Sequence, residues 1–142
     1  MKKIRVIYTS QAAKHFSQRD LLDLLHDCRA YNSLDSIYGF LYYKDKIFFQ
    51  VLEGETKSVE GLLDRIEKDP RHFNLKIYFK KSVENYLFSN WSMGCIEFNN
   101  PRLSLIPSLK GELESKENIE RIINNLPEIT SLLISNPELN LQ

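Results

Sequence analysis

The sequence predicts an α+β fold in which five strands form one mixed sheet. Three observations lead to this expectation. The length of 142 residues fits one domain, because domains usually contain about 100 to 150 residues. Segments of period two alternate along the chain with amphipathic segments of helical period. One strand-like segment is apolar on both faces, so the sheet that contains it needs cover on both sides.

The N-terminal segment predicts a strand followed by a helix. Side chains alternate from Ile4 to Thr9 with the period of a strand, and residues 10–16 are expected to form a loop. Ser17 precedes Asp20 by three residues, which is the spacing of an N-terminal capping box. Apolar residues follow at helical spacing, and this helix is expected to end near Tyr31 and Asn32, where Asn32 would ordinarily be a C-terminal cap.

The next segments, residues 37–43 and 46–53, are aromatic and β-branched and predict a hairpin. Its short polar turn lacks the Asn-Gly pair that is typical of such turns. In the second strand of this hairpin, one face carries Phe48, Gln50 and Leu52, and the other carries Ile47, Phe49 and Val51. Because both faces are apolar, this strand is expected to be central and covered twice.

A second amphipathic helix is expected from Val59 to Ile66, ending before Pro70. Residues 75–83 and 93–98 predict the fourth and fifth strands. The resulting order, βαββαββ, fits a ferredoxin-like topology in which two crossovers place both helices on the same face.

The C-terminal residues supply the second cover. Two apolar stripes at helical spacing are separated by Pro127: Ile119, Ile122, Ile123 and Leu126, and then Ile129, Leu132 and Leu133. We expect two C-terminal helices on the other face of the sheet. The alternative is that this stripe forms a dimer seam. Residues 99–111 resemble a linker.

Charge and motif content exclude several function classes. Lys and Arg number 19, as do Asp and Glu, and a net charge of zero disfavours direct binding of nucleic acid or an anionic membrane. The sequence has no nucleotide-binding glycine motif, no metal-ligand spacing of His or Cys, and no nucleophile elbow, so neither an enzyme nor a metal site is expected. With two distant cysteines and no secretory or membrane segment, a cytoplasmic location is expected.

Gln50 is the unusual residue of the predicted core. A buried amide without partners costs roughly 1–3 kcal/mol, so Gln50 needs hydrogen-bond partners. Bonds to neighbouring backbone would be the ordinary explanation. Tyr8, at the end of an apolar strand face, would ordinarily be a core ring with its hydroxyl at the rim.

Several segments together resemble the BLUF family, the sensors of blue light using FAD. The resemblance spans about residues 3–98 and rests on Tyr-Thr-Ser at 8–10, Asn32, Ile-Tyr-Gly-Phe-Leu at 37–41, Phe-Gln-Val-Leu-Glu-Gly at 49–54, Asp-Pro-Arg-His at 69–72 and Trp-Ser-Met-Gly at 91–94. The family's fold, a ferredoxin-like sheet with two helices clasping a flavin, agrees with the architecture predicted from the residues.

The resemblance implies that Tyr8 and Gln50 are the photoactive pair, in which Gln50 bridges the Tyr8 hydroxyl and the flavin. Light-driven electron and proton transfer from Tyr8 would rearrange the hydrogen bonds of Gln50 and give a reversible red-shifted signalling state. Trp91 and Met93 match the segment linked to signal output, and the sequence leaves open which of them lies next to Gln50. The expected output route continues through the fifth strand to the C-terminal helices.

The other residues implied to bind the cofactor surround this pair. Asn32 is expected to hold the polar edge of the flavin, Arg71 and His72 to lie near its pyrimidine side or ribityl chain, and Arg65 and Asp69 to support them. FAD is the family's usual ligand, but the sequence shows no adenine site, so FMN or riboflavin remain alternatives.

Residues 1–98 are thus expected to form the photosensor, and residues 99–142 a linker and helical cap in the same unit. In its length the chain resembles the short members of the family, which act through a separate effector protein and often form homo-oligomers. By alternation Tyr38 should face away from Gln50, toward the C-terminal helices, whereas Tyr31 could stack near the flavin edge. A ferredoxin-like hydrolase and a single-stranded RNA binder are the competing interpretations, but the first lacks a nucleophile and the second a basic surface.

Overall fold

The computed structural model describes residues 2–96, 109 and 111–142. It contains one sheet with the strand order β4-β1-β3-β2-β5. The strands are β1 (Lys3–Ala12), β2 (Tyr38–Lys44), β3 (Ile47–Glu55), β4 (His72–Ser82) and β5 (Gly94–Ile96). The helices are α1 (Gln18–Leu34), α2 (Thr56–Glu67), α3 (Lys116–Asn124) and α4 (Leu126–Ser135), followed by a short 3-10 turn at Pro137–Leu139. Because β2 and β5 pair in parallel and the other pairs are antiparallel, the sheet is mixed, as predicted.

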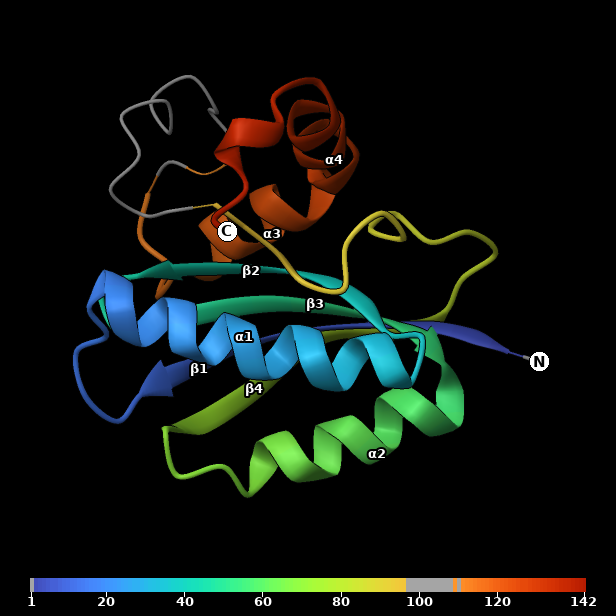
Figure 1. The fold of residues 1–142 in the computed structure, drawn as a ribbon. Coiled ribbons are helices and arrows are strands. Elements are labelled where there is room, and N and C mark those ends of the chain that lie inside the picture. The colour runs from blue at the N-terminus through green and yellow to red at the C-terminus, as the bar shows by residue number, and fades with distance from the viewer. Residues whose placement is uncertain (1, 97–108, 110) are drawn as a thin grey trace.

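The elements form three layers. Helices α1 and α2 cover one face of the sheet, and α3 and α4 cover the other (Figure 1). We call the apolar layer beneath α1 and α2 the helix-side core, and the layer beneath α3 and α4 the tail-side core. The predicted placement of both pairs of helices is confirmed. Pro127 lies in the first turn of α4, where a missing backbone N–H costs nothing.

Strand β3 is central and buried on both faces, as predicted. Phe48 and Leu52 belong to the helix-side core, whereas Phe49 and Val51 belong to the tail-side core. The side chain of Tyr38 also packs on the tail-side core, away from Gln50, and its ring centroid lies 5.5 Å from that of Tyr86.

A buried carboxylate lies near the end of β3. Glu53 is fully buried and accepts a hydrogen bond from Arg5 Nε on β1 at 2.7 Å. It also accepts bonds from the backbone N–H groups of Leu87 and Phe88, at 2.9 and 2.7 Å. Glu53 therefore ties the segment between β4 and β5 to the centre of the sheet.

Helix α1 begins as predicted but ends later. The Ser17 hydroxyl accepts from the Asp20 backbone N–H at 3.1 Å, and the Asp20 carboxylate accepts from the Ser17 N–H at 3.0 Å, which completes the capping box. The expected end near Asn32 is wrong, because the helix continues to Leu34. The Asn32 side chain is buried and bonds to a distant carbonyl instead of capping the helix.

Strand β1 ends later, and strand β4 begins earlier, than predicted. β1 continues to Ala12, within the segment expected to be a loop, and Ala12 pairs with His72 at the start of β4.

The hairpin turn between β2 and β3 consists of Asp45 and Lys46, with φ of 50° and 67°. Two left-handed residues match the twist of a two-residue hairpin, so the turn forms without the Asn-Gly signal.

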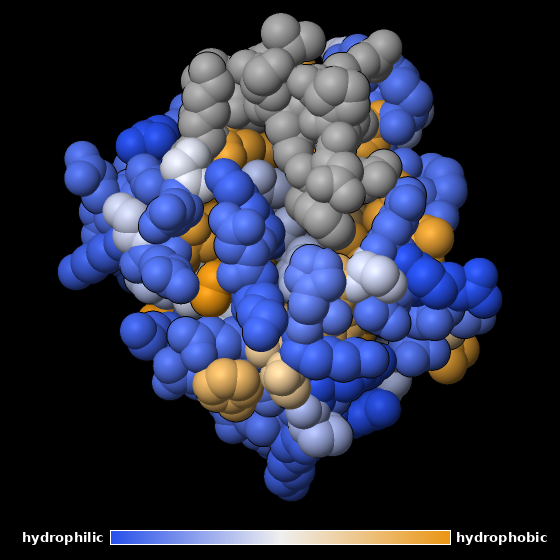
Figure 2. Space-filling model, turned by 90° about the vertical axis from the view of Figure 1, so that its left-hand side faces the viewer, coloured by the Kyte–Doolittle hydropathy of each residue, from blue (hydrophilic) through white to orange (hydrophobic). Residues whose placement is uncertain are grey.

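The surface seen in one view is mostly hydrophilic, as expected when apolar residues fill two buried layers. Figure 2 shows a face on which hydrophilic residues predominate and apolar residues appear in small, separate patches. None of the described helices is long and apolar enough to cross a membrane. Most of the predicted linker, residues 99–111, and the predicted end of the fifth strand at Phe98 lie outside the described residues.

Candidate functional site

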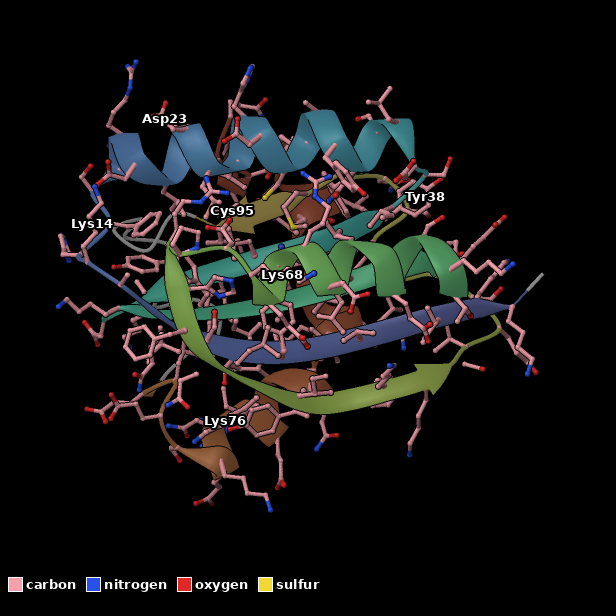
Figure 3. All side chains as sticks on the ribbon, turned by 90° about the horizontal axis from the view of Figure 1, so that it is seen from below. Lys14, Asp23, Tyr38, Lys68, Lys76 and Cys95 are labelled. Carbon is pink, nitrogen blue, oxygen red and sulfur yellow. The ribbon has the colours of Figure 1, made fainter. Side chains whose placement is uncertain are left out.

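Helices α1 and α2 lie side by side over one face of the sheet (Figure 3). A cavity lies between these helices and that face. Its empty volume is about 840 Å³, part of which is open to solvent. All seven residues predicted to bind the cofactor line it: Tyr8, Asn32, Gln50, Arg65, Asp69, Arg71 and His72. They come from strands β1, β3 and β4, helices α1 and α2, and the loop between α2 and β4, so the fold brings the predicted set together.

Tyr8 and Gln50 form the centre of the sheet wall. The two residues are opposite each other in the antiparallel pairing of β1 and β3, and the Tyr8 hydroxyl donates a hydrogen bond to Gln50 Oε1. Gln50 Nε2 in turn donates to Met93 Sδ at 3.6 Å. The buried amide therefore has two side-chain partners, which answers the need for partners inferred from the sequence.

The environment of Tyr8 keeps its phenol neutral. Burial raises the pKa of Tyr8 well above its ordinary value, and the nearby Cys28 and Asp69 raise it further. The hydroxyl is thus a retained proton donor at neutral pH. Burial also raises the pKa of the Cys28 thiol, in the α1 wall, to about 11.

Met93, and not Trp91, is the neighbour of Gln50. Met93 is buried in the helix-side core, whereas Trp91 packs on the tail-side core with its ring centroid 6.2 Å from that of Phe88. Asn32 Nδ2 donates to the carbonyl oxygen of Ser92 at 2.7 Å. This bond fixes the segment before β5 against α1, with Met93 directed toward Gln50.

Charged side chains lie at the mouth of the cavity. Arg71 Nη2 donates to Asp69 Oδ2 at 2.6 Å, and Arg71 Nη1 lies 3.4 Å from Asp27 Oδ2 on α1. Hydrogen bonds from Arg71 lower the pKa of the Asp69 carboxyl. The Arg65 guanidinium lies 4.1 Å from the centre of the Tyr31 ring, so Tyr31 also lies at the cavity.

His72 is oriented by a backbone contact. Its Nε2 lies 2.6 Å from the carbonyl oxygen of Ile66, and because a carbonyl only accepts, Nε2 carries the proton of this bond. The other ring nitrogen, Nδ1, takes no part in this bond.

The walls suit a flat heteroaromatic group with one polar edge. Leu24 from α1 and Leu62 and Ile66 from α2 supply apolar surfaces, and the sheet supplies Leu41 and Phe48. One cavity-lining atom, the buried hydroxyl oxygen of Ser10, has no hydrogen-bond partner among the described residues. Such an orphaned polar atom is expected in a site whose ligand completes the hydrogen bonding.

Sequence reasoning missed three cavity residues that have polar or titratable side chains: Ser10, Asp27 and Cys28. Ser10 follows Tyr8 by two residues on the same strand face, and Cys28 precedes Asn32 by four on the same helix face. Extending these periods from the predicted residues would have found both. Asp27 gave no signal of its own, because its partner, Arg71, lies on a distant loop.

The comparisons with known proteins agree with this site. A sequence model of the BLUF family, described as sensors of blue-light using FAD, matches residues 4–94. The photo-activated state of BlsA is 34% identical, with a TM-score of 0.71 over 88% of this chain and 94% of that one. The BLUF protein BlrB, in its dark state, shares the fold at 23% identity, with a TM-score of 0.77 over 92% of this chain and 96% of that one. The described residues contain the elements of this fold and the C-terminal helices, and no catalytic domain in addition to them.

Among curated proteins, the chain is similar to the photoactivated adenylate cyclase subunit beta of Euglena gracilis, with 31% identity over 87 residues. The corresponding subunit of Euglena longa is 37% identical over 87 residues. These matches cover 61% of this chain but only 10% of either relative, so the chain spans about a tenth of their length. Since the family match spans most of the chain and the cavity holds the predicted residues, the protein belongs to the BLUF family of blue-light sensors, whose domains bind flavin.

Proposed function

We propose that this protein senses blue light through a hydrogen-bond switch at Gln50 that is driven by electron and proton transfer from Tyr8. The observation that carries the proposal is the chain of contacts from the Tyr8 hydroxyl through the Gln50 amide to the Met93 sulfur. A bound flavin supplies blue-light absorption and, in its excited state, a strong one-electron oxidant.

Tyr8 is suited to give up an electron and a proton and to regain both. Its phenol is oxidisable, it is held neutral by burial, and its proton already lies in a hydrogen bond to Gln50. Because Tyr8 and a bound flavin would both stay in place, the electron and the proton would return to Tyr8, and no net redox change would remain. The lasting change is in the hydrogen bonding of Gln50.

Gln50 is suited to the switch because its amide has both a carbonyl acceptor and two N–H donors. Rotation or tautomerisation exchanges which of these faces Tyr8, the cavity and Met93. The thioether of Met93 is a weak acceptor, so little holds the dark orientation on that side. One rearranged hydrogen bond is worth about 0.5–1.5 kcal/mol, which shifts a balanced equilibrium without unfolding the domain.

We further propose that FAD is the flavin, with FMN or riboflavin as alternatives. Asn32 would hold the polar edge of the ring next to Gln50. Arg71 and His72 would lie toward its pyrimidine side or side chain, supported by Arg65 and Asp69. Support comes from their common position around one cavity and from the Ser10 hydroxyl that lacks a partner among the described residues.

The output of the switch is proposed to be altered binding of a separate effector protein, with the sensor itself as a homo-oligomer. Nucleic acid and membrane are not proposed as direct partners, because the net charge is zero. The similarity to BlsA and BlrB over nearly the full length of those chains supports a sensor of this kind.

The absorption spectrum of the purified protein tests the proposal. A yellow protein whose flavin band shifts reversibly to the red under blue light is the expected result. A colourless protein that cannot be reconstituted with FAD, FMN or riboflavin would refute flavin binding. A yellow protein without any reversible shift would refute the switch.

A further inference from the structure

Arg29 on α1 makes an unusual set of contacts for a half-buried cation. Its Nε donates to the carbonyl oxygen of Met93 at 3.0 Å, and its Nη2 donates to the carbonyl oxygen of Leu141 at 2.5 Å. Nη2 also lies 3.4 Å from Asn140 Oδ1. All three acceptors are neutral oxygens. They belong to two segments that are far apart in the sequence, one at Met93 and the other at residues 140–141.

These C-terminal residues cover the outer edge of β5. Asn140 forms an antiparallel bridge with Ile96, and its side-chain Oδ1 accepts from the Cys95 N–H at 2.9 Å. The Leu141 N–H donates to the Cys95 carbonyl oxygen at 2.7 Å. Since β2 occupies the other side of β5, residues 140–141 occupy the side that would otherwise be an open sheet edge. Figure 1 shows the chain end returning to the sheet after α4.

Arg29 and Gln50 contact the same residue from different sides. Gln50 contacts the Met93 side chain, and Arg29 holds the Met93 backbone carbonyl. Met93 is followed directly by β5, so a movement of Met93 changes both the Arg29 bond and the position of the strand edge. A single guanidinium thus joins the residue next to the proposed switch to the end of the chain.

We propose that Arg29 is a positioning residue that couples the Gln50 switch to the docking of residues 140–141 on β5. This inference rests on the proposed function. When the hydrogen bonds of Gln50 rearrange, Met93 shifts, its carbonyl moves away from Arg29, and Arg29 loses the geometry in which it holds Leu141. The C-terminal residues then leave β5, and the hydrogen bonds between residues 140–141 and Cys95 are lost.

Hydrogen exchange of the flavin-loaded protein, in the dark and under blue light, tests this coupling. In the wild type the amides of Cys95 and Leu141 are protected in the dark, and light accelerates their exchange roughly fivefold or more, the lower end of coupling between two sites. In Arg29→Gln these amides exchange fast already in the dark and light adds no further increase, while the flavin still shows its red shift. Arg29→Lys, which keeps the charge, restores part of the dark protection.

Arg19→Gln is the matched control. Arg19 lies on the same helix and is exposed. Its only ion-pair partner among the described residues is Asp23, at 3.5 Å, so this variant should behave as the wild type. Asn140→Ala approaches the same contact from the other side and should release Cys95 in the dark even if Arg29→Gln fails to fold.

The outcomes separate this inference from the proposed function. A wild type without a red shift refutes the proposed switch, whatever the exchange shows. A normal red shift with unchanged exchange at Cys95 and Leu141 refutes the coupling alone. Equal light-induced acceleration in the wild type and in Arg29→Gln or Asn140→Ala would also overturn it.

Discussion

The Tyr8 hydroxyl donates a hydrogen bond to Gln50 Oε1 across the directly paired strands β1 and β3. The two residues are 42 positions apart in the sequence, and strand pairing alone brings them opposite each other. Because both side chains are buried and belong to a rigid central pair of strands, their contact is set by the sheet and not by a loop.

Tyr8→Phe should retain flavin and lose the reversible red shift. The substitution keeps the ring that forms the cavity wall and removes only the proton donor. Absorption spectra before and after blue light measure both properties. Tyr42→Phe is the control, since Tyr42 is buried on the opposite face and its hydroxyl donates to the Leu109 carbonyl at 3.4 Å. A normal photocycle in Tyr8→Phe would contradict the role of Tyr8.

Gln50→Leu should also abolish the red shift, although Tyr8 remains. Leucine has no group that can change between donor and acceptor. It also leaves the buried Tyr8 hydroxyl unpaired, so the free energy of unfolding in urea should fall by about 1–3 kcal/mol. Gln11→Leu, on the half-exposed end of β1, should change neither quantity appreciably. Wild-type spectral behaviour in Gln50→Leu would show that the switch lies elsewhere.

Asp69→Asn should weaken the dependence of stability on acid pH. Hydrogen bonds from Arg71 lower the pKa of Asp69 in the folded state, below the unfolded value of about 3.9. The carboxylate therefore stabilises the fold above that value, and this contribution is lost as the pH falls through the lower, folded pKa. Urea titrations between pH 6 and pH 2, taken as roughly spanning this window, measure it.

Asp23→Asn controls for the simple loss of one carboxylate. Asp23 lies on the outer side of α1, where its partner is the exposed Arg19 (Figure 3). If both variants flatten the acid limb of the stability curve equally, the contact between Asp69 and Arg71 is not its source.

Two glycine substitutions should have opposite effects on stability. A Cβ at Gly39 would lie 2.1 Å from the Val51 carbonyl oxygen and 3.1 Å from Met93 Cε, so Gly39→Ala should destabilise the protein by about 1–3 kcal/mol. A Cβ at Gly61 in α2 meets no atom within 4 Å, so Gly61→Ala should stabilise it by about 0.4–1 kcal/mol. Urea unfolding measures both, and equal midpoints would contradict the crowding at Gly39.

The features that the sequence predicted correctly depend on short-range patterns. The capping box at Ser17 is formed by residues that are close together in the sequence, and so are the two apolar faces of β3. The choice between Trp91 and Met93 was not predictable, because the segment before β5 has no regular period. Asn32 was misplaced at a helix end because its partner, the Ser92 carbonyl, is 60 positions away. Arg29 was missed for the same reason, since its acceptors are 64 to 112 positions away.

The burial of β3 on both faces affects how the alignment of β1 and β3 is selected when the sheet folds. A strand with one polar face loses its core when its pairing slips by one residue, but β3 would exchange one apolar face for the other. Hydrophobicity alone therefore distinguishes the correct alignment poorly, and the choice falls to the buried polar groups. Gln50 meets Tyr8, and Glu53 meets Arg5, only when β1 and β3 are aligned as observed. The contact between Tyr8 and Gln50 thus also selects the alignment in which the sheet folds.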